Sequence, residues 1–211
     1  MPGREGAADP RAQALVAAAY DLLAEGGLEG LTIRAVLART GLARRAFYDN
    51  FGGKDDLVLA VFAQTLSAAA RQLGTWANDK PTPLDRLQFI VQSIVLGQFG
   101  LEETPAGARD LRGAALSREH RRRAEGRPAE LASALAPLLG AMAGYLSDGM
   151  ADGSVRGGDA ERLALLVYNL VSTTVHTELL AEESGIPFEA RRKALDDELW
   201  EFCPRPVAGW R

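Results

Sequence analysis

The sequence predicts an all-α protein of about nine helices, and three observations lead to this prediction. Ala, Leu, Arg and Glu dominate, and apolar residues recur at spacings of three and four, the period of an amphipathic helix. β-Branched residues rarely cluster, and no Asn-Gly or Asp-Gly pair separates two alternating apolar runs, so strand signals are nearly absent. Prolines and glycines fall where helix ends tolerate them. At 211 residues, the chain is long enough for one large domain or two small ones.

Capping residues and glycines divide the first third of the chain into four expected helices. The first begins at Asp9-Pro10, where Asp supplies an N-cap and Pro suits the first turn. It ends at Gly26-Gly27. Thr32 can cap a short second helix that Gly41 ends. The other two helices are expected over residues 43–50 and from Lys54 onward.

Further breaks divide the rest of the chain. Lys80-Pro81-Thr82-Pro83 is one break, and a loop around Gly153 to Gly158 is another. We expect an N-terminal DNA-binding domain over residues 1–56 and a helical ligand-binding and dimerisation bundle over residues 57–211. The helices expected beyond the first break cover residues 83–99, 105–123, 128–150, 159–183 and 187–202.

The formal net charge of −4 argues against a polycation, but this charge is unevenly distributed. Residues 1–31 hold two basic and five acidic residues, whereas residues 32–54 hold five basic residues and one acidic residue, a net of +4. Binding to phosphates requires such a local positive surface, whatever the total charge. The distribution therefore favours nucleic-acid binding by residues 32–54.

Residues 32–54 have the layout of a helix-turn-helix. A short helix is followed by the turn Thr40-Gly41-Leu42, where glycine permits the unusual backbone, and then by a second short helix. Apolar side chains can pack both helices against the first helix; these are Val36, Leu37, Leu42 and Phe47, opposite Leu15, Leu22 and Leu23. The second short helix then exposes Arg44, Arg45, Tyr48, Asp49 and Asn50.

Within residues 9–60, this region resembles the DNA-binding domain of the tetracycline-repressor (TetR) family of bacterial transcription regulators. The motifs that carry the resemblance are Thr32, Gly41-Leu42-Ala43, Phe47-Tyr48 and Phe51-Gly52-Gly53-Lys54-Asp55-Asp56-Leu57. The alternative is a charged helical hairpin on a surface, and the joint spacing of these motifs argues against it.

The resemblance implies a role for each matched residue. Thr32 and Tyr48 would each use a hydroxyl on a DNA phosphate. Lys54 would pair with a phosphate, helped by the positive end of its helix. Arg44 and Arg45 would reach base edges or phosphates in the major groove, where an arginine can bond a guanine through two hydrogen bonds.

The chain departs from the family pattern at four positions. Ala43 stands where Ser is common, so a cap and a phosphate donor are lost. Ala46 replaces a common Thr, and Asn50 replaces a common His, although its amide can still donate to DNA. Asp49 would repel a phosphate if it faced the backbone; alternatively it accepts from a cytosine amine or pairs with Arg45.

The last two long helices are expected to pair with a second copy of the chain, as the resemblance implies. The alternative is that their apolar residues face only the chain's own core. We favour dimerisation, because a lone helix-turn-helix usually needs a symmetric partner to reach two half-sites. The interface candidates are Leu163, Leu166, Leu170, Val171, Val175, Leu195, Leu199 and Phe202.

An effector site is expected among the helices of residues 83–183. Asn169, Thr173 and His176 form a polar stripe at helical spacing, which suits ligand recognition in an apolar pocket. A polar seam at the dimer contact or a satisfied buried histidine is the reading we favour for this stripe. The aromatic and sulfur-containing candidates, which we more readily expect to be plain core, are Phe89, Phe99, Met142, Tyr145 and Tyr168.

The arginine-rich stretch Arg118 to Arg127 suggests a second anion site, but its two acidic residues favour a solvated face or a mobile loop. Enzyme motifs are missing: the chain has no P-loop, no GxSxG and no HExxH, and only two histidines. The single cysteine, Cys203, excludes an internal disulfide and a cysteine-rich zinc site. No metal or cofactor is expected.

Together these features predict a homodimeric regulator, a repressor that a small apolar effector releases from a palindromic double-stranded operator. The alternative is a helical pocket protein or an enzyme acting on a hydrophobic small molecule. Residues 1–10 lack the apolar core of a secretory signal, and one cysteine suits a reducing compartment, so a cytoplasmic location without membrane attachment is expected.

Overall fold

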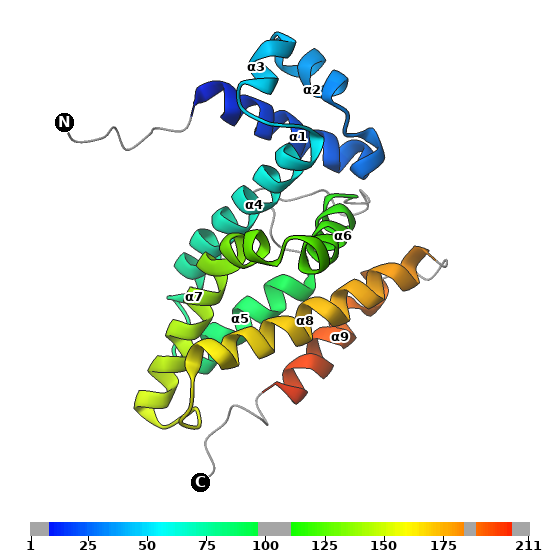
Figure 1. The fold of residues 1–211 in the computed structure, drawn as a ribbon. Helices are drawn as coiled ribbons and strands as arrows, with labels where there is room; N and C mark the ends of the chain where they lie inside the picture. The colour runs from blue at the N-terminus through cyan, green and yellow to red at the C-terminus, as the bar shows by residue number, and fades with distance from the viewer. Residues whose placement is uncertain (1–8, 97–110, 184–188, 204–211) are drawn as a thin grey trace, which may run out of the picture. The chain divides into compact units, whose positions relative to one another are not determined.

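A computed structural model describes residues 9–96, 111–183 and 189–203. Over these residues the chain forms nine α-helices and no strand, which confirms the predicted all-α class (Figure 1). The helices are α1 (Pro10–Gly30), α2 (Ile33–Thr40), α3 (Arg44–Tyr48), α4 (Lys54–Ala77), α5 (Pro83–Leu96), α6 (Leu111–Gly126), α7 (Pro128–Asp152), α8 (Ala160–Glu183) and α9 (Glu189–Phe202).

The chain divides into two compact units. The N-terminal unit comprises Met1–Gln64 and Pro105–Arg122, and the C-terminal unit comprises Thr65–Thr104 and Arg123–Arg211. Helices α4 and α6 therefore each contribute to both units. The N-terminal unit is discontinuous in sequence, because it takes in α6 up to Arg122.

The helix ends of the N-terminal unit follow the predicted capping chemistry. Gly27 has φ 57° and ψ −156° and interrupts α1, so the expected break is confirmed even though helical turns continue to Gly30. The Thr32 hydroxyl accepts a hydrogen bond from the Ala35 N–H at 3.1 Å and so caps α2. Gly41 takes the left-handed conformation, with φ 68°, and ends α2.

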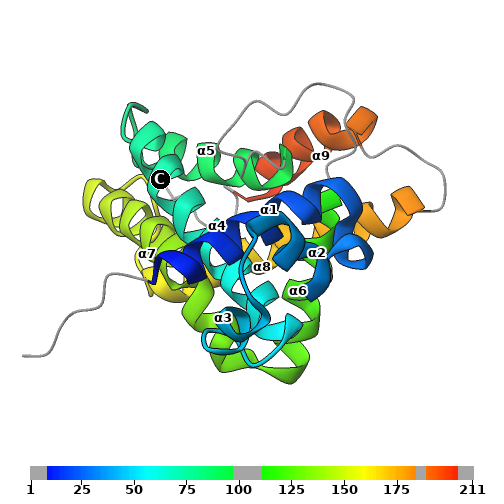
Figure 2. The ribbon, with the colours of Figure 1, turned by 90° about the horizontal axis from the view of Figure 1, so that it is seen from above.

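The core of the N-terminal unit places α2 and α3 against α1 (Figures 1 and 2). Phe47 anchors the short helix α3, because its side chain is fully buried while its neighbours on both sides along the chain include exposed residues. Its ring lies 5.2 Å from that of Tyr48 and 5.7 Å from that of Phe51, centroid to centroid. The main buried contributors are Leu15, Leu23, Leu31, Val36, Phe47, Leu57 and Val61.

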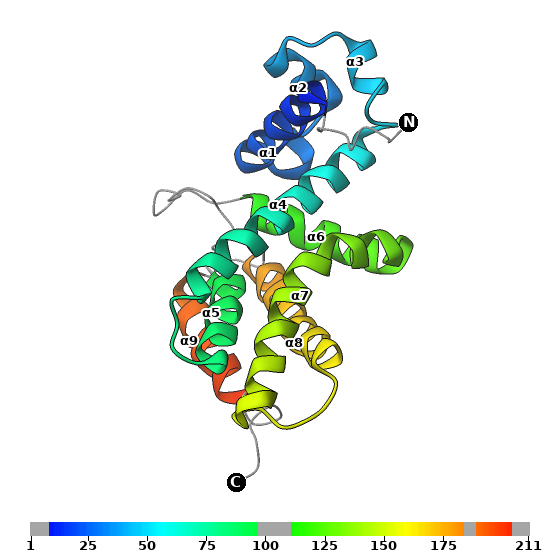
Figure 3. The same ribbon diagram turned by 90° about the vertical axis from the view of Figure 1, so that its left-hand side faces the viewer.

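The C-terminal unit is a bundle of longer helices. Helix α5 packs against α7, α8 and α9, and α7 packs along α8 (Figure 3). Its fully buried apolar residues include Leu87, Ile90, Leu138, Met142 and Val171. Helix α7 ends at Asp152, two residues later than expected, where Gly153 has φ 80°.

Helices α4 and α7 are long and apolar enough to cross a membrane by length and composition alone. In this protein, 50% of the apolar window of α4 and 39% of that of α7 are buried inside the fold. Such burial is typical of the core helices of a helical bundle, so the two helices do not indicate a membrane protein.

Candidate DNA-binding interface

Helix α3 presents a basic and aromatic surface over a buried anchor. Ala46 and Phe47 are buried, whereas Arg44, Arg45 and Tyr48 are exposed. The structure therefore brings together three of the six predicted DNA-binding residues on one five-residue helix. This helix is shorter than the expected span of residues 43–50. Ala43 precedes it without a side-chain cap, as its missing hydroxyl predicts.

Arg44 and Tyr48 form one contact on this surface. The Arg44 Nη2 donates to the Tyr48 hydroxyl at 3.4 Å, and the guanidinium lies 5.6 Å from the centroid of the tyrosine ring. A cation over an aromatic face is attracted by the ring quadrupole. The tyrosine oxygen acts as acceptor here, so its own O–H stays available to donate to a phosphate.

Arg45 and Asp49 form an exposed ion pair, with Arg45 Nε 3.9 Å from Asp49 Oδ2. This is one of the two alternatives that the sequence left open for Asp49. Exposed pairs of this kind contribute about 0–1 kcal/mol, so the arginine can leave its partner at little cost. Arg45 is therefore free to reach DNA, although its charge is partly balanced in this conformation.

Asn50 is more committed than the sequence suggested. Its Nδ2 donates to the Ala46 carbonyl at 2.9 Å, so one amide hydrogen is used to close the C-terminal end of α3. The other amide hydrogen remains for a contact with DNA. Thr32, in contrast, keeps its hydroxyl hydrogen for a phosphate, because its oxygen only accepts at the start of α2.

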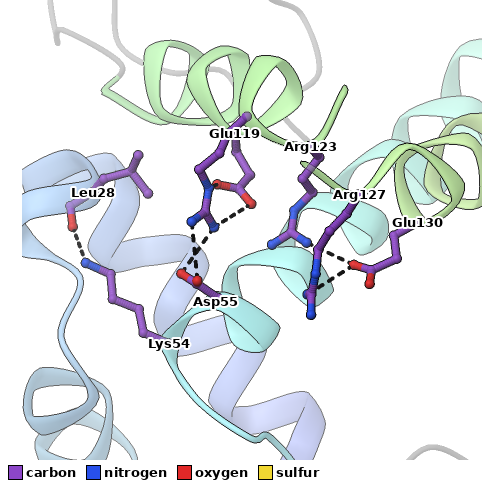
Figure 4. A network of polar contacts seen from close by, with 8 residues as sticks. Leu28, Lys54, Asp55, Glu119, Arg123, Arg127 and Glu130 are labelled. Atoms are coloured by element: carbon purple, nitrogen blue, oxygen red, sulfur yellow. Dashed lines mark hydrogen bonds and ion pairs between the residues drawn. The ribbon is translucent and has the colours of Figure 1, made fainter. Parts of the chain in front are cut away.

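Lys54 makes a contact that sequence reasoning missed. Its Nζ donates to the carbonyl of Leu28 at 2.7 Å and thereby ties the start of α4 to the last turns of α1 (Figure 4). A cation at the C-terminal end of a helix is favourable for the helix dipole. The ammonium has three donors, so two remain for a phosphate.

Arg39 leaves the free positive surface, another feature that the sequence did not indicate. Its Nη1 and Nη2 donate to the two carboxylate oxygens of Glu25, both at 2.8 Å, and join α2 to α1. The hydrogen bond to Arg39 lowers the pKa of Glu25, and the bond to Glu25 raises the pKa of Arg39. A pair 14 positions apart in sequence cannot be found from helical spacing.

The predicted ligand-binding residues do not share one face. Met142, Tyr145 and Tyr168 are buried, and burial raises the pKa of both tyrosines. Asn169 and Thr173 are exposed and lie on a different face of α8 from Tyr168. The other candidates are Phe89 and His176, which are partly buried, and Phe99, which lies outside the described residues.

The predicted dimer residues divide into buried and exposed groups. Leu166 and Phe202 have exposed fractions of 50% and 57%, large values for apolar side chains. The buried group contains Leu163, Val171 and Leu199, and the partly buried group contains Leu170, Val175 and Leu195.

The arginine-rich stretch is neither a uniformly solvated face nor a loop. Its residues up to Gly126 belong to α6, and the side chain of Arg123 is only 2% exposed. Arg123 Nη1 lies 3.0 Å from Glu130 Oε2, and Arg127 Nη1 lies 3.3 Å from the same oxygen (Figure 4). The expectation of a solvated stretch is wrong for Arg123, because a carboxylate on the next helix compensates its burial.

Comparison with known proteins decides the nature of the N-terminal region. Residues 15–61 match the sequence pattern of the bacterial regulatory proteins of the tetR family. This region is a TetR-family domain. The TetR pattern spans α2, α3 and the start of α4, and it contains all six predicted DNA-binding residues.

Solved TetR-family structures share the fold over most of the chain. The transcriptional regulator FadR from Bacillus subtilis, in complex with stearoyl-CoA, aligns with a TM-score of 0.68 at 18% identity, covering 92% of this chain and 98% of FadR. Reduced NemR from E. coli aligns with a TM-score of 0.68 at 16% identity, covering 95% and 98%. A putative TetR-family regulator from Mesorhizobium loti gives 0.66 and 16%, covering 94% and 96%. No curated protein matches the sequence of the chain.

Proposed function

We propose that the chain is a homodimeric, ligand-responsive transcription regulator that represses by binding a palindromic operator. The observation that carries the proposal is the α3 surface of the TetR-family domain, where Arg44, Arg45 and Tyr48 are exposed above the buried Phe47. A helix of this kind enters the major groove of B-DNA, where an arginine can contact guanine through two hydrogen bonds.

The remaining predicted contacts surround α3 and suit phosphates. Thr32 lies at the N-terminal end of α2 and Lys54 at that of α4, and helix N-termini favour anions. Tyr48 and Asn50 retain donors on either side of the buried Phe47. Phosphate contacts would set the register on DNA, while Arg44 and Arg45 would read bases.

Dimerisation and effector binding are assigned to the C-terminal unit. Exposed Leu166 and Phe202 support a contact with a second copy, since large exposed apolar residues mark interaction surfaces. FadR, which shares the fold, is a regulator in complex with stearoyl-CoA, and this supports an apolar effector. The effector must bind the DNA-incompetent state more tightly, because equal affinity shifts nothing. We place the protein in the cytoplasm and assign it no enzymatic activity.

Fluorescence anisotropy with a labelled duplex from the DNA directly upstream of the coding sequence tests the DNA-binding part of this proposal. Binding is expected to weaken steeply with salt. Arg44→Ala and Arg45→Ala are each expected to cost about 1–3 kcal/mol if they contact bases. Arg71→Ala, an exposed arginine on α4 in the C-terminal unit, is the matched control. Wild-type affinity in the Arg44→Ala/Arg45→Ala double variant would contradict the assignment of α3.

Sedimentation equilibrium at micromolar concentration tests the dimer. A species of twice the 22.6 kDa chain mass is expected for the wild type. Leu166→Glu should shift the population towards the single chain, because a charge in an apolar interface is costly. Asn169→Glu, on an exposed neighbour, is a control for the added charge itself. A wild type that sediments only as a single chain would contradict the proposal of a dimer.

A further inference from the structure

We propose that Arg122, on α6, is a positioning residue for the DNA-binding interface. It holds the N-terminal end of α4, where Lys54 lies, by pairing with Asp55 next to it. This inference rests on the proposed function and assigns a distant part of the chain to the same site. Arg122 and Asp55 both belong to the N-terminal unit.

The contact between the two side chains is made by both carboxylate oxygens. Arg122 Nη1 donates to Asp55 Oδ2 at 3.2 Å, and Arg122 Nη2 lies 3.1 Å from Asp55 Oδ1 (Figure 4). A planar guanidinium that meets a carboxylate through two nitrogens fixes orientation as well as distance. The contact therefore fixes the direction of the first turn of α4.

A second carboxylate fixes Arg122 on its own helix. Its Nε and Nη2 donate to Glu119 Oε2 and Oε1 at 3.0 and 3.2 Å. The Glu119 side chain is only 3% exposed, whereas that of Asp55 is 66% exposed. A buried carboxylate is costly without its cation, so Arg122 stays with Glu119 and presents a preorganised site to Asp55.

Helix α6 also supports α4 at a second point. The ring of Phe62 lies 6.4 Å from that of His120, centroid to centroid. Phe62 follows Asp55 by two helical turns, so both contacts lie on one face of α4. Two contacts along one face restrict rotation of α4 about its axis, and rotation is the movement that would displace Lys54.

The charge of Asp55 gives this arrangement a further consequence for DNA binding. Asp55 follows Lys54 directly in the first turn of α4, where we expect a phosphate. An unpaired carboxylate beside that phosphate would repel it. Arg122 therefore has two effects through one residue, since it positions α4 and neutralises Asp55. The two carboxylates in turn raise the pKa of Arg122, which stays charged.

A double-mutant cycle on the full chain tests the inference, with the labelled upstream duplex as probe. Arg122→Ala should weaken DNA binding by about tenfold in the wild-type background but by less than about twofold in Asp55→Ala, since Arg122 acts through Asp55. Arg122→Lys, which keeps the charge, should recover most of the loss. Arg121→Ala, an exposed neighbour on α6, should leave affinity unchanged. An equal loss from Arg122→Ala in both backgrounds would overturn the inference.

The salt dependence of binding separates a positioning residue from a phosphate contact. Arg122→Ala should leave the slope of log affinity against log salt unchanged, whereas loss of a phosphate contact lowers it by about one unit. A slope lowered by one unit would overturn the inference in favour of direct contact. If the wild type fails to bind DNA in a salt-dependent manner, the proposed function itself fails. If wild type binds and Arg122→Ala binds equally well, only the role of Arg122 fails.

Asp55→Ala keeps the test decisive if Arg122→Ala does not fold. This variant leaves the buried Glu119–Arg122 pair intact and removes only an exposed partner. Its urea unfolding midpoint should match the wild type, because exposed ion pairs contribute little to stability. Its DNA affinity should fall by about threefold, the part of the effect that comes from positioning alone. Wild-type affinity in a folded Asp55→Ala variant would overturn the inference.

Discussion

The N-terminal unit and the C-terminal unit hold their helices together by different means. In the N-terminal unit, polar contacts between separate helices add to a small core: Arg39 joins α2 to α1, Lys54 joins α4 to α1, and Arg122 joins α6 to α4. In the C-terminal unit, helices of up to 25 residues pack along apolar faces. Short helices are marginal alone, so the DNA-binding surface depends on its tertiary contacts more than the bundle does.

Truncation of the α3 anchor is the largest expected effect and separates the units most clearly. Phe47→Ala should cost about 3–5 kcal/mol, because it removes a fully buried ring from a five-residue helix. The chain's three tryptophans, Trp76, Trp200 and Trp210, all belong to the C-terminal unit. In urea, the far-UV circular dichroism of Phe47→Ala should therefore change before the tryptophan fluorescence does.

The matched variant in the bundle is Leu138→Ala, which should cost about 2–5 kcal/mol. It should lower the midpoint of the fluorescence transition and leave the earlier dichroism change of the N-terminal unit in place. Coincident transitions in both variants would show that the two units unfold as one, and the contrast between them would then not extend to stability.

Restoration of the missing cap is the next effect in size. Ala43→Ser places a hydroxyl at the N-cap of α3 and should stabilise the N-terminal unit by about 0.5–2 kcal/mol. Ala38→Ser, an exposed position within α2, is the control, because serine inside a helix is neutral or unfavourable. Thermal unfolding of both variants measures the difference. Equal melting temperatures for the two would mean that α3 does not limit this unit.

Asp196 tests the same contrast from the side of the bundle, where a carboxyl lies buried between α9 and α5. Burial raises its pKa, Asp197 raises it further, and Gln92 and Lys193 lower it. The folded state then binds the proton more tightly than the unfolded state. Its contribution to stability is full below the unfolded pKa of 3.8 and is lost as pH rises through the higher folded pKa.

Asp196→Asn removes this titration and should raise the free energy of unfolding at pH 7. The gain over the wild type should shrink as the pH is lowered towards 4, as urea titrations at several pH values would measure. The control is Asp197→Asn, on an exposed neighbour that pairs with Lys193 at 3.5 Å. A gain that stays constant with pH would contradict burial of a titrating carboxyl.

The smallest effect is expected for the exposed pair that joins α2 to α1. Arg39→Ala should destabilise the N-terminal unit slightly at low salt and not at all in 1 M salt, because salt screens exposed charges. The pKa of Glu25 is lowered in the folded state, so the effect should also vanish as pH falls through that value. Thermal unfolding at two salt concentrations measures it, and a loss that persists in 1 M salt would indicate a packing role for the arginine stem.

Local chemistry made much of the N-terminal unit predictable. Thr32 as N-cap, Gly41 as the left-handed end of α2 and Lys54 as the start of α4 each depend on a few neighbouring residues, and the structure confirms all three. The recognition of a TetR-family domain is likewise confirmed. The boundary expected between residues 56 and 57, and the roles of individual site residues, remain predictions.

Contacts between distant residues could not be predicted in the same way. Periodicity shows that a helix has an apolar face but not which helix will cover it, so the burial of Arg123 against Glu130 stayed hidden. The same holds for Asp55 and Arg122, which are 67 positions apart. In α9, Asp196 shares the buried face of Leu199 and Cys203, although its charge indicates a solvent position.

The discontinuous N-terminal unit has a consequence for protein engineering. Regulators are recombined by grafting one DNA-binding head onto another sensor, and a cut after residue 64 is the simplest design for this chain. Such a graft would leave out residues 105–122, and with them the guanidinium that meets Asp55 and the ring that meets Phe62. A transplanted head should therefore work best when the acceptor's sixth helix is also rewritten to carry Glu119, His120 and Arg122.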